Sequence, residues 1–515
     1  MDISIKISDY INIYIWRFFS LCTGFLSLLI VVPLLSSNIE LFGLYSFCTG
    51  FVLYLTYADI GFLNASSKFA AEEYAKNNLD EEYKIFGFTF FLLILMFFPF
   101  SLLMIFFSFN PEALIDSTDQ SILQISSYLF LVIGLLVPFQ VFLQRLVGLI
   151  LTIRLKDYIF YRIEILANLV KIFSVYFFFT ESSYLIAEYF LFITIISILS
   201  ALMSIWLLKK EINYSFYKFF SSLSLSKKYF NKTKKLAFSS LAVTIGFIIY
   251  YEIDLLIIGK FIGLKEVGIY AIAFTILNFL RNIVNIFYSP FAQRFNHFVG
   301  QQQERKLIEM FNKLFDYTIP LFILSHLVLF LCIDEMILLW VGAEFKESIL
   351  ISKILIICSL VGVVTQPANH YFFAKLHYKY LYTLAFFLPF SFLTTIYYLL
   401  PTLGILSIAY AKLLASVLGF MICLIGVTKV TDVIKLSIEW LPRITVLILL
   451  ILIATPFLEQ LFLYDSKNSL ALVSLSSILS LLIIISYFLA LILKENNRKE
   501  VLFIIKRVKR YFIDR

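Results

Sequence analysis

The chain has 515 residues, of which 61% are hydrophobic and only 15% are charged, and its mean hydropathy is +0.92. These values exclude an ordinary water-soluble globular protein and predict a polytopic membrane protein. The formal net charge of +8 fits basic loops on one side of a membrane, in contact with anionic lipid, and gives no reason to expect nucleic-acid binding.

Apolar runs recur along the whole chain, and each is long enough to cross a hydrocarbon core of ~30 Å as a helix. The runs are continuous and rich in Leu, Ile and Phe, unlike the alternating strands of a β-barrel, so we predict an all-α fold. Fourteen spans are predicted, at residues 11–35, 41–64, 85–108, 122–150, 158–180, 184–207, 236–260, 267–291, 313–341, 349–374, 381–400, 404–428, 442–464 and 469–493.

The basic residues predict the orientation of these spans. An even number of spans places both termini on one side. The loops and termini of that side, counted with the ends of the adjoining spans, hold 31 of the 42 basic residues, whereas the opposite loops hold four. Because Lys and Arg loops stay in the cytoplasm, both termini are predicted to be cytoplasmic.

The first five spans contain three basic residues that we select as candidates for an anionic substrate. Arg17 lies on a stripe of small polar residues about 9 Å from the start of its span, where a lipid anchor is an equal alternative. Arg145 ends the fourth span near the cytoplasm, where it can receive substrate or simply mark the interface. Lys171 lies near the centre of the fifth span, with Glu164 on the same helical face, so an internal salt bridge is the alternative for it.

Acidic residues within the spans are candidates for holding a coupling H⁺ or Na⁺. Asp59 lies near the inner end of the second span, and Glu252 with Asp254 lies roughly 9 to 12 Å inside the outer end of the seventh. Pairing with basic neighbours is the alternative, and the sequence leaves the partners open.

The eighth span carries the strongest signal of a site. Its polar residues recur every three or four positions and therefore share one helical face: Thr275, Asn278, Arg281, Asn282, Asn285 and Ser289. Arg281 lies ~15 Å from the inner end of the span, too deep to reach the head groups comfortably. A stripe of this kind needs protein or water around it, so we predict that it lines a hydrated cavity.

An internal repeat indicates the domain organisation. Gly43 and Tyr45 in the second span recur as Gly268 and Tyr270 in the eighth, at an offset of 225 residues, and a second pair of segments matches at 134–145 and 362–375. An offset of six helices predicts two six-helix lobes related by a pseudo-two-fold axis along the membrane normal, with the substrate path between them. The predicted parts are lobe 1–207, basic cytoplasmic linker 208–235, lobe 236–428, two additional helices within 429–493, and basic tail 494–515.

Several functions are disfavoured by what the sequence lacks. There is no GxxxxGK[ST] phosphate-binding loop, no clustered His or Cys spacing for a metal, and no outer loop long enough to fold a catalytic domain. We therefore expect no metal, no cofactor and no catalytic residues, and we predict a secondary transporter rather than an enzyme.

The residues above resemble those of a known family. The segments FGLYSFCTGFVLYLTYADIGFLNASSKFAAEEY and YYEIDLLIIGKFIGLKEVGIYAIA are similar to the early helices and to the seventh and eighth helices of Wzx-type polysaccharide flippases. These flippases belong to the multidrug/oligosaccharidyl-lipid/polysaccharide (MOP) exporter superfamily, which also contains the MATE transporters. The resemblance covers most of the chain, and the two additional C-terminal helices resemble those of lipid II flippases.

The resemblance implies a substrate and a location. It implies translocation of undecaprenyl-pyrophosphate-linked repeat units of O-antigen or capsule, as in lipopolysaccharide biosynthesis, across the bacterial inner membrane by alternating access. It also makes a polysaccharide polymerase and a chain-length regulator candidate partners, besides membrane lipids.

The residues fit that substrate. Arg281, supported by Arg17, Lys171 and Arg145, is expected to attract the diphosphate, and Thr275 with the asparagines at 278, 282 and 285 is expected to line the sugar path. Two alternatives stay open: a MATE-like cation-coupled drug antiporter, and a membrane glycan polymerase or ligase.

Overall fold

The computed structural model describes residues 7–56, 61–115, 117–154, 156–180, 183–375 and 377–428. Within these ranges the chain is helical almost throughout, apart from a short hairpin of Phe179–Thr180 (β1) and Ser183–Tyr184 (β2). It divides into two compact units between Ala271 and Ile272. The predicted all-α membrane fold is confirmed, whereas the predicted boundary at 208–235 stays a prediction.

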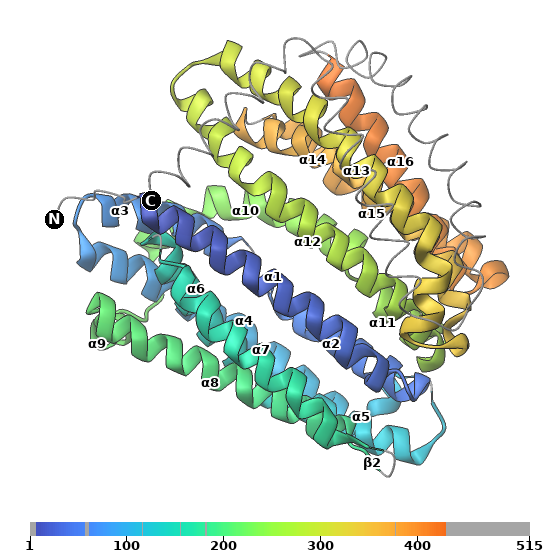
Figure 1. The fold of residues 1–515 in the computed structure, drawn as a ribbon. Coiled ribbons are helices and arrows are strands. Elements are labelled where there is room, and N and C mark those ends of the chain that lie inside the picture. Colours follow the sequence, from blue (N-terminus) through green and yellow to red (C-terminus); the bar gives the residue numbers. More distant parts are fainter. Residues whose placement is uncertain are drawn as a thin grey trace, which may run out of the picture. The chain divides into compact units, whose positions relative to one another are not determined.

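The first unit is a bundle in which α1 packs along α7 and α7 along α8, and these long helices run along a common direction (Figure 1). Its elements are α1 (Ile7–Leu35), α2 (Ile39–Thr56), α3 (Phe62–Ala75), α4 (Leu79–Phe109), the 3-10 turn η1 (Pro111–Ala113), α5 (Gln120–Leu135), α6 (Val137–Ile153), α7 (Tyr158–Phe178), α8 (Ile186–Ile212), α9 (Phe216–Ser221), α10 (Lys227–Tyr251), α11 (Asp254–Phe261) and the start of α12 (Leu264–Gly300).

Most predicted spans coincide with one helix where the structure describes them, but the spans at 41–64, 122–150 and 236–260 are each divided between two helices. Among the described residues, nine helical stretches are long and apolar enough to cross a membrane. The predicted span at 122–150 is interrupted at Leu136, since Pro138 in the first turn of α6 has no N–H to donate to the preceding turn. The predicted spans at 442–464 and 469–493 lie outside the described residues, so the number of fourteen stays a prediction.

The predicted linker at 208–235 is helical over much of its length. It forms the end of α8, all of α9 and the start of α10, and three of its lysines form ion pairs with the α3–α4 hairpin: Lys232 with Glu73 at 3.3 Å, Lys218 with Asp80 at 2.9 Å and Lys228 with Glu81 at 2.5 Å. The hydrogen bond from Lys232 holds the pKa of Glu73 below its ordinary value. Three of the eight basic residues of this linker are therefore paired with carboxylates of the same unit.

A buried ion pair joins the start of α4 to the end of α6. Arg154 Nη2 lies 2.8 Å from Glu82 Oε1, and the two side chains are only 4% and 1% exposed. The guanidinium also lies over the rings of Tyr74 and Tyr214, at 4.6 and 5.2 Å from their centroids. The charge of Arg154 is thus enclosed by one carboxylate and two aromatic rings.

Gly43 and Gly268, which correspond in the predicted repeat, lie where α2 crosses α12. A Cβ atom on Gly43 would overlap the carbonyl oxygen of Leu264 and lie 3.0 Å from the backbone nitrogen of Gly268. A Cβ atom on Gly268 would overlap the carbonyl oxygen of Ile39. Because the obstacles are backbone atoms, they cannot move aside as a flexible side chain would, and both positions require glycine.

We expect Gly43→Ala and Gly268→Ala each to lower the free energy of unfolding by about 1–3 kcal/mol, since the added methyl group forces two helix backbones apart. Gly148→Ala is the matched control, because a Cβ atom there meets nothing within 4 Å. Its stability should be unchanged or slightly higher. Unfolding of the three variants in mild detergent checks this, and equal stabilities would show that the crossing is not tightly packed.

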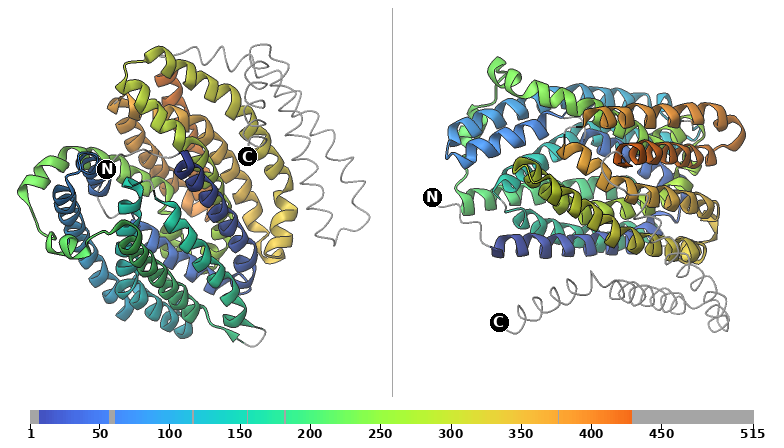
Figure 2. Two further views of the ribbon diagram at one scale, coloured as in Figure 1. Left: turned by 60° about the vertical axis from the view of Figure 1, so that its left-hand side comes forward. Right: turned by 90° about the horizontal axis from the view of Figure 1, so that it is seen from above.

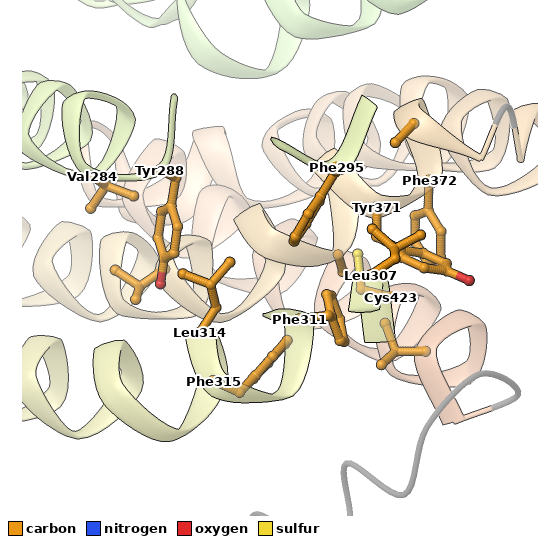
Figure 3. Packing of buried hydrophobic residues seen from close by; sticks show 14 of the residues in the cluster. Val284, Tyr288, Phe295, Leu307, Phe311, Leu314, Phe315, Tyr371, Phe372 and Cys423 are labelled. Carbon is orange, nitrogen blue, oxygen red and sulfur yellow. The ribbon is translucent and has the colours of Figure 1, made fainter. Parts of the chain in front are cut away.

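The second unit contains the remainder of α12 and the helices that follow it, α13 (Glu304–Trp340), the 3-10 turn η2 (Ala343–Phe345), α14 (Glu347–Ala374), α15 (Tyr378–Leu403) and α16 (Leu406–Thr428). Helices α14, α15 and α16 pack closely against one another (Figure 2). The core contains Tyr288 and Phe295 of α12, aromatic residues of α13, and Phe372 of α14 (Figure 3). This aromatic core fixes one face of α12 and so determines which face stays accessible.

Candidate functional site

The polar stripe of α12 is accessible rather than enclosed in the core. Arg281, Asn278 and Thr275 are half-buried, and Asn282 and Asn285 are exposed. Arg281 Nη1 donates a hydrogen bond to Asn278 Oδ1 at 2.9 Å, which holds the guanidinium against its own helix. The hydrated cavity expected around these groups stays a prediction.

The core-facing side of α12 is distinct from this stripe. Val284, Tyr288 and Phe295 are buried in the aromatic core (Figure 3). Tyr288 shares a hydrogen bond of 2.6 Å with Thr318 of α13. At 100° per residue, the stripe from Thr275 to Asn285 covers roughly 120° of the helix beside this buried face. The two faces explain how one helix can carry both a packed core and a row of amides.

A second helix contributes to the stripe. Gln366 of α14 donates from Nε2 to Asn285 Oδ1 at 2.8 Å, in an exposed setting. One turn further along α14, His370 Nε2 is buried and, among the described residues, has no hydrogen-bond partner. Sequence reasoning missed Gln366, and the available signal was its position in the polar segment TQPANH, inside an otherwise apolar span.

Arg17 is placed differently from Arg281. Its Nη2 lies 3.1 Å from Asp157 Oδ2, and its guanidinium lies 5.6 Å from the centroid of the Tyr161 ring. Asp157 precedes α7 and is largely buried, which raises its pKa although Arg17 acts in the opposite direction. The charge of Arg17 is therefore balanced within the α1–α7 seam.

Lys171 is held between two helices. Its Nζ donates to Ser197 Oγ of α8 at 2.7 Å, and it interacts electrostatically with Glu164 on its own helix. Arg145 is half-buried on α6 and makes contacts of its own. Lys171 and Arg145 belong to the first unit and Arg281 to the second, and their joint role in binding an anion stays a prediction.

Two of the three candidate ion-coupling residues, Glu252 and Asp254, lie in the described part of the chain. Asp254, at the start of α11, is fully buried and accepts a hydrogen bond of 2.6 Å from Tyr270 of α12. The backbone carbonyl of Glu252 accepts a hydrogen bond from Tyr54 of α2 at 2.8 Å. Asp59 lies outside the described residues. In the part of the chain that the structure describes, no group of three His, Cys, Asp or Glu side chains is arranged to hold a metal ion.

Residues 18–291 match the family described as polysaccharide biosynthesis protein. The chain belongs to this family. The matched region contains Lys171, Asp254 and the whole stripe from Thr275 to Ser289, and no curated protein sequence matches the chain.

Solved structures of low sequence identity show the same fold as this polysaccharide biosynthesis protein. The lipid II flippase MurJ in its inward closed conformation has a TM-score of 0.65 and 16% identity, over 95% of this chain and 100% of that chain. An inward-facing MATE multidrug transporter of the MOP superfamily has a TM-score of 0.59 and 13% identity, over 81% and 95%. A eukaryotic MATE transporter has a TM-score of 0.56 and 12% identity, over 85% and 99%. The expected MOP superfamily fold is thereby confirmed.

Proposed function

We propose that this protein is a flippase for lipid-linked oligosaccharides. It moves undecaprenyl-pyrophosphate-linked repeat units of O-antigen or capsule from the cytoplasmic to the periplasmic leaflet of the bacterial inner membrane by alternating access, and it performs no chemical reaction on them. The observation that carries the proposal is the accessible row of amides around Arg281, in a chain of the polysaccharide biosynthesis family.

The position of Arg281 supports this proposal. It is the eighteenth residue of the 37-residue helix α12, so it lies near the middle of a helix about 55 Å long. A cation at mid-depth is costly in a membrane unless it faces water, protein or an anion. A diphosphate provides such an anion, and the guanidinium can bind its oxygens through two parallel hydrogen bonds.

The amide groups of the stripe suit the sugar part of the substrate. Asn278, Asn282, Asn285 and Gln366 offer both donors and acceptors, which is what sugar hydroxyl groups require. Amide groups bind the hydroxyl groups of many different sugars. The stripe therefore supports a glycan as the class of substrate and does not select a particular sugar. Within this proposal, Asp254 and Glu252, with Asp59, hold the coupling H⁺ or Na⁺, and a polymerase and a chain-length regulator receive the product.

The function can be tested with purified full-length protein in proteoliposomes. We expect transbilayer movement of undecaprenyl-diphosphate-linked oligosaccharide to exceed that of empty vesicles by at least about tenfold. The free oligosaccharide and a lipophilic cationic dye should not be moved, since neither offers a lipid-linked diphosphate. Movement of the dye without the lipid-linked sugar would identify a drug antiporter instead, and formation of a new glycosidic bond would identify an enzyme.

A further inference from the structure

Arg162 lies on the exposed surface where α1 packs against α7. Its Cζ atom lies 4.6 Å from the ring centroid of Trp16 on α1 and 5.1 Å from that of Tyr158 on α7. The side chain is exposed. Among the described residues, no carboxylate lies within ion-pair distance of it, in contrast to Arg17, which Asp157 neutralises in the same seam.

Two aromatic rings restrict how the Arg162 guanidinium can be used. Rings attract a cation to their faces, and they hold the planar group in place without taking up its hydrogen-bond donors. The N–H groups of guanidinium lie in its plane, and two of them match the spacing of two phosphate oxygens. The site therefore offers one positive charge and a prearranged fork of donors.

The surface of α7 beyond Arg162 is apolar. The exposed residues that follow at helical spacing are Leu166, Val170, Phe173 and Phe177. Arg162 lies ~6 Å from the start of α7, and the stripe continues for ~22 Å beyond it. A bilayer leaflet has about 15 Å of hydrocarbon, so this stripe is long enough to cover the acyl chain of a phospholipid whose phosphate lies at Arg162.

We propose that Trp16, Tyr158 and Arg162 form a binding site for the phosphate of an anionic glycerophospholipid, whose acyl chain lies along the apolar stripe of α7. Charge complementarity favours this occupant. The lipid phosphate carries one negative charge and Arg162 one positive charge, whereas the ammonium group of a zwitterionic head group would be repelled. Aromatic side chains at the level of the head groups suit the same position.

The test uses full-length protein in detergent and native mass spectrometry. We expect phosphatidylglycerol to be retained in preference to phosphatidylcholine, and Arg162→Gln to reduce this retention roughly tenfold, as for the loss of one bidentate contact to a charged group. Trp16→Leu keeps the charge and removes one ring, so a smaller loss is expected. Arg162→Lys keeps the charge but loses the fork and should also bind less lipid.

Lys210 supplies the matched control. It is an exposed cation of the same unit and lies over a single ring, 5.2 Å from the centroid of Trp206. Lys210→Gln should leave retention of phosphatidylglycerol unchanged.

Equal losses of phosphatidylglycerol in the Arg162 and Lys210 variants, or none in either, would overturn the site in favour of non-specific attraction. Displacement of phosphatidylglycerol by undecaprenyl diphosphate at equal concentration would overturn the phospholipid assignment and make the site one for the transported lipid. If Arg162→Gln does not fold, Arg162→Lys decides between these outcomes.

Discussion

Replacing Arg281 with alanine is expected to lower the rate of lipid-linked oligosaccharide transport by roughly tenfold to a hundredfold. The loss corresponds to one hydrogen-bonded contact between a guanidinium and a charged group, worth about 1.5–3 kcal/mol. Folding should be little affected, because Arg281 is half-buried and its side chain bonds to Asn278 of the same helix. The measurement is the initial rate in proteoliposomes that contain equal amounts of protein.

Two further variants show whether the guanidinium itself is needed. Arg281→Lys keeps the charge without the planar fork, so its rate should lie between those of wild type and the alanine variant. Arg305→Ala removes an exposed arginine from the start of α13 and should transport at the wild-type rate. If Arg281→Ala transports as fast as Arg305→Ala, the diphosphate is bound elsewhere.

Local periodicity accounts for what the sequence revealed about the site. The polar residues of α12 recur at helical spacing, so their common face could be predicted from one span alone. On that face Asn282 and Asn285 are exposed and Arg281 is half-buried, and their role in transport stays a prediction. The fold was predictable for a similar reason, because in a bilayer a long apolar run can satisfy its backbone only as a helix.

Contacts between distant segments account for what the sequence did not reveal. Asp157 lies 140 residues from Arg17, and no pattern links the two positions. Gln366 contributes a single amide to α14, and only the packing of α14 beside α12 shows that it meets Asn285. The prolines were equally ambiguous: Pro138 opens a new helix, whereas α14 continues through Pro367.

The largest effect on stability is expected at the buried pair of Glu82 and Arg154. Glu82→Leu should lower the free energy of unfolding by about 3–5 kcal/mol, because it leaves a guanidinium buried without its carboxylate. Arg154→Met should cost less, since a carboxyl group can take up a proton and become neutral whereas a guanidinium keeps its charge. The rings of Tyr74 and Tyr214 compensate only part of the lost attraction. Unfolding measured in mild detergent gives the order of the two variants.

The double variant Glu82→Leu with Arg154→Met distinguishes a buried charge from a packing defect. It removes both charges and fills the space with apolar atoms, so its stability should recover to near the wild-type value. The exposed pair of Lys218 and Asp80, 2.9 Å apart, is the control, and removing its carboxylate with Asp80→Asn should leave stability close to wild type because solvent screens both charges. If the double variant is less stable than either single variant, the shape of these side chains matters more than their charge. If the stability of the double variant recovers, the contact between α4 and α6 requires buried side chains without a net charge and does not require an ion pair.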